Sequence, residues 1–198
     1  MTTALLTAPA IRVRPTSNRL FTVADLAALP DELPSGPVRY ELDDGVLIAM
    51  APAADIHSAK QFTLALILGA HGQAKGLGQG RMESAIILRR NPDRVAIADA
   101  AFLTTDQFPL KHSKEGYLET IPKLVIEVKS KNDTWPEVES KVSEYLAAGV
   151  ELVWVLDQKA TVIRAYSASQ PNQFLATTDI VTAPFLPGFA VPVAEFFA

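Results

Sequence analysis

The 198-residue sequence predicts a mixed α/β (α+β) fold in which a central β-sheet is flanked by helices. Short runs rich in aliphatic and β-branched residues, bounded by Gly, Pro, Asn and Asp, are typical of strands. Amphipathic stretches with capping residues are typical of helices. One region combines a strand over 124–129, a capped helix that stops at Gly149 and a strand over 151–156. Because this is a crossover unit, its two strands should be parallel neighbours.

Composition limits the classes of protein to consider. With 198 residues, of which 48% are hydrophobic, the chain can bury a substantial core. Lys+Arg number 18 and Asp+Glu 22, a net charge of −4, so nucleic-acid binding would have to depend on local positive charge. The absence of cysteine excludes disulfides, thiolate metal sites and thiol catalysis. The sequence has no signal-peptide pattern and no apolar run of membrane-spanning length, which predicts a cytoplasmic protein.

The first part of the chain contains a predicted arm, a helix and a hairpin. Residues 1–19, with scattered arginines among Thr and Pro, are expected to form a loose N-terminal arm, and residues 20–198 a single domain. A short helix should follow Thr22, whose hydroxyl can cap its first turn. Two extended runs around the Asp-Asp-Gly turn at 43–45 predict a hairpin with Glu41 on its first strand.

An amphipathic helix is predicted over 55–71, with His57 in its first turn. The residues expected to form its buried stripe recur at three- and four-residue spacing: Ala59, Phe62, Leu66 and Ala70. Further strands are predicted over 81–90 and 95–103. The apolar tail over 185–197 is expected to dock on the body of the domain or to contribute to a dimer interface.

Three charged residues occupy unusual positions in the predicted strands. Glu127 and Lys129 lie two residues apart, so they share one face of the strand at 124–129. Asp99 stands alone among small apolar residues in the preceding strand. Such groups are costly to bury unless they are paired, solvated or bound to a ligand. An isolated Glu-x-Lys is most often a structural ion pair, but Asp99 extends it to a set of two acids and a lysine.

The chemistry that uses such a set is metal-assisted phosphodiester hydrolysis. A hard divalent cation such as Mg²⁺ prefers oxygen ligands and keeps several waters, so two carboxylates and a phosphate oxygen suit it. The metal polarises the phosphoryl group and lowers the pKa of a bound water. A nearby lysine can orient the water or stabilise the charge that develops on the phosphate.

The arrangement of Asp99 followed by Glu127-Val128-Lys129 resembles the PD-(D/E)XK nuclease superfamily. More closely, roughly residues 20–197 resemble the bacterial Uma-type restriction-endonuclease family. The matching pieces follow one another along the chain: Tyr40-Glu41-Leu-Asp-Asp-Gly45, Ala51-Pro52 with His57, the Asp99 strand, Pro122-Lys-Leu-Val-Ile-Glu127-Val-Lys129-Ser130, Lys141-x-x-Glu144-Tyr145, Trp154-Val-Leu-Asp157 and Leu186-Pro187-Gly188-Phe189. Each piece is weak alone, and their order and spacing carry the resemblance.

The resemblance implies a restriction-endonuclease-like PD-(D/E)XK fold and a Mg²⁺-dependent endonuclease, with Mn²⁺ as an alternative metal. DNA would be the substrate, and cleavage of both strands would favour a homodimer. Asp99 and Glu127 would bind the metal, with the carbonyl of Val128 as a further ligand. Lys129 would be the catalytic lysine, and Glu41 an auxiliary acid near the metal.

Two further residues are implied by the resemblance and one position departs from it. His57 and Lys141 would stand behind the metal ligands or face the phosphate. The family usually has proline before the strand aspartate, whereas Ala98 precedes Asp99 here. A literal Pro-Asp pair ends at Asp93, in a predicted turn where such a pair is ordinary. Because the proline does no chemistry, we expect Asp99 to be the ligand and Asp93 a decoy.

Other functions remain open at the level of sequence. The densest basic cluster could contact DNA or could be ordinary surface arginines: Arg81, Arg89, Arg90 and Arg94. The acidic net charge also suits a non-catalytic module that binds nucleic acid or protein and retains the fold. A third hypothesis is a structural ion-pair network in which Lys129 bridges Glu127 and Asp99. A Schiff-base enzyme built on Lys129 is disfavoured, because neighbouring carboxylates would keep the lysine protonated.

Overall fold

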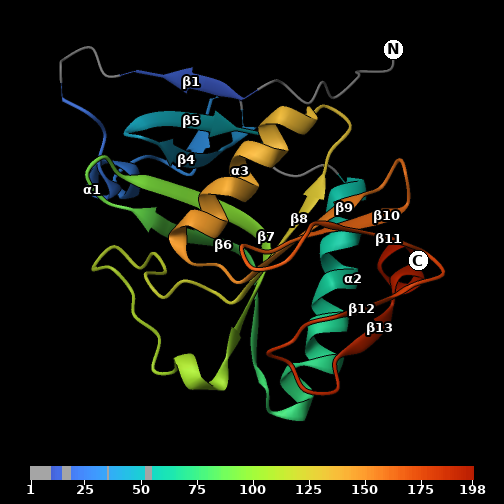
Figure 1. Ribbon diagram of the computed structural model, residues 1–198. Helices are drawn as coiled ribbons and strands as arrows, with labels where there is room; N and C mark the ends of the chain where they lie inside the picture. The colour runs from blue at the N-terminus through green and yellow to red at the C-terminus, as the bar shows by residue number, and fades with distance from the viewer. Residues whose placement is uncertain (1–9, 15–18, 35, 52–54) are drawn as a thin grey trace, which may run out of the picture.

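The structure of the protein, a computed structural model, describes residues 10–14, 19–34, 36–51 and 55–198, and for 55–57 the backbone alone. Its main feature is a nine-stranded mixed sheet (Figure 1). The helices, including three short 3₁₀ turns, are α1 (Val23–Ala27), α2 (Asp55–His71), η1 (Gln73–Lys75), η2 (Thr105–Gln107), α3 (Trp135–Ala148) and η3 (Val193–Phe197). The strands are β1 (Ile11–Val13), β2 (Glu32–Leu33), β3 (Gly36–Pro37), β4 (Arg39–Asp43), β5 (Val46–Met50), β6 (Gly78–Arg89), β7 (Arg94–Thr104), β8 (Leu124–Lys129), β9 (Leu152–Asp157), β10 (Val162–Tyr166), β11 (Gln173–Ala176), β12 (Ile180–Thr182) and β13 (Ala190–Pro192).

The sheet divides in the middle of β7. The strand order is β1-β5-β4-β7-β8-β9-β10-β11, and β6 pairs with β7 as well. The first part of β7 meets β4, where Val95 faces Leu42, and its last part meets β8, where Ala100 faces Ile126. Asp99 lies just before the pairing with β8 begins. The point at which β4 and β8 separate is called the fork below.

The crossover unit has the predicted form. β8 and β9 are parallel, with Leu124 opposite Leu152, and α3 connects them. Thr134 and Glu137 form a reciprocal capping box at the start of α3. Gly149 ends the helix with φ +106°, a left-handed conformation that glycine adopts without strain. The prediction of parallel neighbouring strands is confirmed.

Two helices cover opposite faces of the sheet. On one face, α2 packs with the C-terminal segment over β7, β8 and β9 around Trp154. On the other face, α3 packs over β8 and β9 through Val142 and Tyr145 (Figure 1). Alternation along β8 therefore sends Ile126 and Val128 toward α2, and Glu127 and its same-face neighbours toward α3.

The N-terminal helix and hairpin form as predicted. Thr22 and Asp25 make a capping box at α1, and β4 and β5 pair around the turn at 43–45. Most of the expected N-terminal arm, residues 1–9 and 15–18, lies outside the described residues. Within residues 1–19, the stretch from Ile11 to Val13 forms β1, which pairs antiparallel with β5.

The stripe predicted for α2 is wrong. The helix has the expected bounds, but Phe62 is 66% exposed and Leu66 57% exposed. The buried residues are instead Leu64, Ile67 and Leu68. Because α2 is apolar on more than one side, three- and four-residue spacing alone permits either stripe. The sheet selects the one that fits against Ala100 and Phe102 and leaves the other in water.

The C-terminal segment docks on its own domain. β12 pairs with β13, and η3 follows directly. Its apolar side chains are almost fully buried: Phe189, Val191, Val193 and Phe196. This confirms the docking prediction. No helix in the described ranges combines the length and apolar character that a membrane span requires.

Candidate functional site

Asp99 lies at the fork and binds the backbone of the next strand. Its Oδ2 accepts a 2.7 Å hydrogen bond from the N–H of Val128, and its Oδ1 accepts one of 3.3 Å from Nε2 of Gln61 on α2. The β7–β8 pairing begins only at Ala100, so the carboxylate binds a β8 amide just beyond the paired residues. The side chain is 8% exposed. Asp99 is thereby fixed against β8, next to Glu127.

Glu127 lies on the α3 face of β8, and α3 supplies both of its side-chain partners. The hydroxyl of Tyr145 donates a 2.6 Å hydrogen bond to the carboxylate, and Nζ of Lys141 lies 3.2 Å from Oε1 and 3.3 Å from Oε2. Burial raises the pKa of Glu127 to about 7. The attraction of Lys141 opposes this rise in pKa, while the nearby charges of Asp99 and Glu41 add to it. This electrostatic coupling shows that the three carboxylates share one environment.

Lys141 bridges two arms of the sheet. Its Nζ donates to Oε1 of Glu41 at 3.2 Å and to the carbonyl of Ile97 at 3.1 Å, in addition to its contact with Glu127. Burial lowers the pKa of Lys141, but Glu127 and Glu41 raise it well above its ordinary value, so the ammonium stays charged. A single cation therefore holds Glu41 of β4 and Glu127 of β8 at the fork.

Glu41 is itself buried in a network of charges. It is 5% exposed and accepts hydrogen bonds from the Ile97 N–H at 2.9 Å and from Nη1 of Arg94 at 3.3 Å. Arg94 also binds Glu144 of α3 at 2.6 Å. Burial raises the pKa of Glu41, but Lys141, Arg94 and the amide outweigh it and leave the pKa below its usual value. Glu41 is therefore ionised, and both of its carboxylate oxygens accept hydrogen bonds.

Lys129 does not make the contacts expected if it bridged Glu127 and Asp99. Its Nζ donates to the carbonyl of Ser130 at 3.2 Å and lies 5.5 Å from the centroid of the Trp135 ring. The ion pair of Glu127 is made by Lys141 instead. Lys129 still borders the same hollow of about 150 Å³ that Glu127, Val128 and Lys141 line. A substrate phosphate in this hollow would meet two lysines.

The donor set at the fork fits a hard divalent cation. Asp99 and Glu127 offer carboxylate oxygens from adjacent strands, and the carbonyl of Val128 belongs to the residue that Asp99 binds. Within the described ranges, no group of three or more His, Cys, Asp or Glu side chains is arranged to hold a metal ion. A bound cation would therefore keep several waters, as Mg²⁺ does. His57 lies in the first turn of α2, but its side chain lies outside the described residues.

The arginine cluster is not a free basic surface. Arg94 is buried in the network described above, and Arg90 pairs with Asp93 and Glu119. Arg89 forms an ion pair with Asp44. The positive charge of these three residues is largely neutralised by acidic partners within the protein. Arg89 and Arg90 fit the alternative of ordinary surface arginines, whereas Arg94 is buried and was not expected to be.

Asp93 has a structural position. It is 8% exposed, and its Oδ2 accepts a 2.8 Å hydrogen bond from the N–H of Val23, the first residue of α1. Arg90 and the amide of Asn91 contact the same carboxylate. Asp93 thus ties the turn between β6 and β7 to α1. This agrees with its assignment as a decoy.

Replacing Asp93 by alanine should lower the free energy of unfolding by about 1–3 kcal/mol, because the buried Val23 amide loses its acceptor. Urea unfolding of the wild type, Asp93→Ala and Asp93→Asn measures this. The asparagine variant keeps an oxygen for the amide and should lose less than the alanine variant. Equal stability of all three proteins would contradict the structural role.

Several residues were not predicted to belong to the site. Tyr145 and Glu144 follow Lys141 at i+4 and i+3 on α3, so helical spacing could have grouped them on one face. Gln61 of α2 binds both Asp99 and, at 2.9 Å, Glu83 of β6. Glu83 has φ +47°, in the left-handed region, between the Met82–Ala100 and Ser84–Ala98 pairs of β6 and β7, whose register is unchanged across it. No local sequence signal marks this irregularity.

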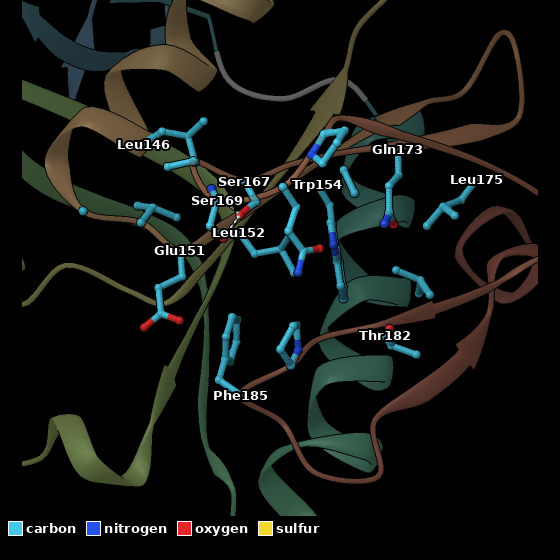
Figure 2. A pocket seen from close by; sticks show the side chains of 18 residues that line it. Leu146, Glu151, Leu152, Trp154, Ser167, Ser169, Gln173, Leu175, Thr182 and Phe185 are labelled. Carbon is cyan, nitrogen blue, oxygen red and sulfur yellow. Dashed lines mark hydrogen bonds between the residues drawn. The ribbon is translucent and has the colours of Figure 1, made fainter.

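A second and larger pocket, of about 440 Å³, lies at the opposite end of β9. Leu152 and Trp154 of β9, Gln173 and Leu175 of β11 and Phe185 line it (Figure 2). The hollow at Glu127 borders Val155 instead. The larger pocket is therefore a separate feature, distinct from the candidate site.

Comparison with known proteins agrees with the resemblance seen in the sequence. The model of the Uma2 family, described as "Putative restriction endonuclease", matches residues 23–194. Among solved structures, the chain is similar to the crystal structure of "a putative nuclease belonging to DUF820" from Anabaena variabilis. The TM-score is 0.70 at 17% identity, over 89% of this chain and 97% of that one. This match confirms the expected restriction-endonuclease-like fold. No curated protein matches the chain.

Proposed function

This chain belongs to the Uma2 family, and from that premise we propose that it is a divalent-metal-dependent endonuclease that hydrolyses phosphodiester bonds in DNA. The observation that carries the proposal is the meeting of Asp99 and Glu127 at the fork, where Asp99 is bound to the Val128 amide. The two carboxylates lie on adjacent strands, and Glu127 also lines the hollow that two lysines border, so the arrangement suits a cation and a phosphate. The proposal includes Mg²⁺ or Mn²⁺ as the cation, a homodimer that cuts both strands and a cytoplasmic location.

In this proposal the residues divide the work. A cation bound by Asp99, Glu127 and the Val128 carbonyl would polarise the phosphoryl group and lower the pKa of a bound water. Lys129, whose ammonium borders the hollow, stabilises negative charge that develops on the phosphate. Lys141 and Glu41 hold the carboxylate of Glu127 in position. Asp99 keeps the two strands at the spacing that the site requires.

Thermal unfolding with and without Mg²⁺ or Mn²⁺ tests the metal site. A ligand that binds only the folded state, at about ten times its Kd, stabilises by about 1.4 kcal/mol. For a chain of this size, that corresponds to a rise in Tm of about 3–6 °C. We expect this rise in the wild type and its loss in Asp99→Asn and Glu127→Gln.

Asp93→Asn is the matched control, because Asp93 and Asp99 are both 8% exposed. It should keep the metal-dependent rise. Each protein is also measured with a short DNA duplex, so that a site completed by phosphate is detected as well. A wild type that gains no stability from metal under either condition would overturn the metal site. Nicking of a supercoiled plasmid, with Mg²⁺ and with EDTA, tests the activity itself.

A non-catalytic binding module is the second candidate. The observation in its favour is charge: the net charge is −4, and Arg89, Arg90 and Arg94 are all paired with acidic residues. Such a module would bind its partner equally well with Asp99→Asn and would not nick a plasmid. Metal-dependent nicking by the wild type would exclude it.

A further inference from the structure

A row of paired residues leads from the candidate site across the α3 face of the sheet. Glu127 of β8 is opposite Val155 of β9, Val155 is opposite Arg164 of β10, and Arg164 is opposite Phe174 of β11. Directly paired residues lie on the same face, and adjacent strands are about 4.8 Å apart. Phe174 is therefore about 14 Å from Glu127 across the sheet, a distance that a few nucleotides of one strand can span.

Arg164 is held between two aromatic rings along this row. Its Cζ lies 3.2 Å from the centroid of Trp135, the first residue of α3, and 5.0 Å from that of Phe174. Lys129 approaches the same Trp135 ring. We call Trp135, Arg164 and Phe174 the Trp135–Arg164–Phe174 stack. Through Lys129 it is continuous with the hollow at Glu127.

Phe174 presents most of its ring to solvent. The side chain is 63% exposed, whereas its neighbours Gln173 and Leu175 point to the other face and line the larger pocket (Figure 2). An aromatic ring in water contributes little to the core. A ring supported from below by a guanidinium offers a flat surface on which a nucleic-acid base can stack, and such stacking is tolerant of sequence.

The surrounding charges are compatible with a nucleic-acid strand. Lys131 and Lys159 are exposed in the loops after β8 and β9. Because these strands are parallel, both loops lie at the carboxyl ends of the strands, on the same side of the sheet's end as the hollow. The acids nearby are engaged locally: Asp133 accepts from the Ser130 amide, and Glu137 from the Thr134 amide. Glu139 is 3.9 Å from Arg164, so attraction to phosphate alone is weak and the base contact matters.

We propose that an unpaired base of a nucleic-acid strand stacks on the outer face of Phe174 and anchors that strand beside the cleavage site. This inference rests on the proposed nuclease function and adds the form of substrate that the site prefers: DNA with a single-stranded or frayed segment. A continuous duplex keeps its bases stacked on one another, so it cannot make this contact without unpairing.

Fluorescence anisotropy with a labelled single-stranded oligonucleotide, in EDTA to prevent hydrolysis, tests the contact. Phe174→Ala and Phe174→Leu should weaken binding by about tenfold, whereas Phe174→Tyr should stay within about twofold. The matched control is Phe62→Ala, since Phe62 is 66% exposed on α2, which covers the other face of the sheet. The affinity for a duplex of the same length should change less than the affinity for the single strand.

Each result has a definite meaning. Wild-type affinity in Phe174→Leu would show that the ring only packs on Arg164, and it would overturn the inference. Failure of the wild type to bind the single strand would overturn it as well. Plasmid nicking by the wild type, measured in parallel, separates the two proposals. If nicking is present and Phe174→Ala binds normally, the stacking contact fails and the nuclease function stands.

Discussion

Replacing Lys129 by methionine should slow plasmid nicking by about 100- to 1000-fold, the loss typical of removing one charge-stabilising donor. The ammonium borders the hollow next to Glu127, and its protein contacts are weak: the carbonyl of Ser130 and the face of Trp135. The stability of the fold should hardly change. The measurement is the initial rate of conversion of supercoiled plasmid in Mg²⁺, together with urea unfolding.

Lys114→Met is the control for this prediction, because the Lys114 side chain is 87% exposed in the loop between η2 and β8. It should nick at the wild-type rate. Lys129→Arg keeps the charge and should recover part of the activity. If Lys129→Met retained its rate to within about threefold, Lys129 would not be the catalytic lysine. The other ammonium at the hollow, that of Lys141, would then be the candidate.

Replacing Lys141 by methionine should lower the free energy of unfolding by about 3–5 kcal/mol, the cost of breaking a buried ion pair by removing one partner. Two carboxylates depend on this ammonium. Glu41 is buried and Glu127 nearly so. Without Lys141, Glu41 still has Arg94 as a cationic partner, whereas Glu127 is left with the neutral hydroxyl of Tyr145. Urea unfolding measures the loss, and metal-dependent nicking should fall with it because Glu127 loses its support.

A second variant distinguishes this ion-pair effect from loss of packing. In Lys141→Met with Glu127→Gln, the carboxylate that has lost its cationic partner is also removed, so the double variant should be more stable than Lys141→Met alone. Lys114→Met again serves as the exposed control. A loss of less than about 1 kcal/mol in Lys141→Met would mean that water already solvates both carboxylates.

Local signals predicted most of the elements correctly. The capping residues Thr22 and Thr134, the stop at Gly149 and the turn at 43–45 each depend on neighbours within a few positions. The sequence also singled out the two acids that the fold brings together, because a carboxylate inside an apolar strand is conspicuous wherever it occurs. Asp99 could therefore be identified as a candidate from its own strand, without knowing which residue it contacts.

The network around Glu41 could not be predicted in the same way. Its contact with Lys141 spans 100 residues and its contact with Arg94 spans 53. The Arg94 pair forms only when β4 meets β7, and the Lys141 pair only when α3 packs on the sheet, so no spacing along the chain predicts them. For the same reason Arg94 was grouped with surface arginines. The sequence of α2 is compatible with two apolar stripes, and only packing against the sheet determines which of them is buried.

The short strand β1 has a consequence for how the isolated protein behaves. It covers the outer side of β5, from Ala49 to Leu47, and replaces a longer row of open amides and carbonyls with a three-residue edge that carries Arg12. Short, charged edges resist pairing with other chains. A version of the protein that starts at residue 20 would uncover β5 and offer it as a template for strand addition, so self-association would follow from trimming a segment remote from Glu127.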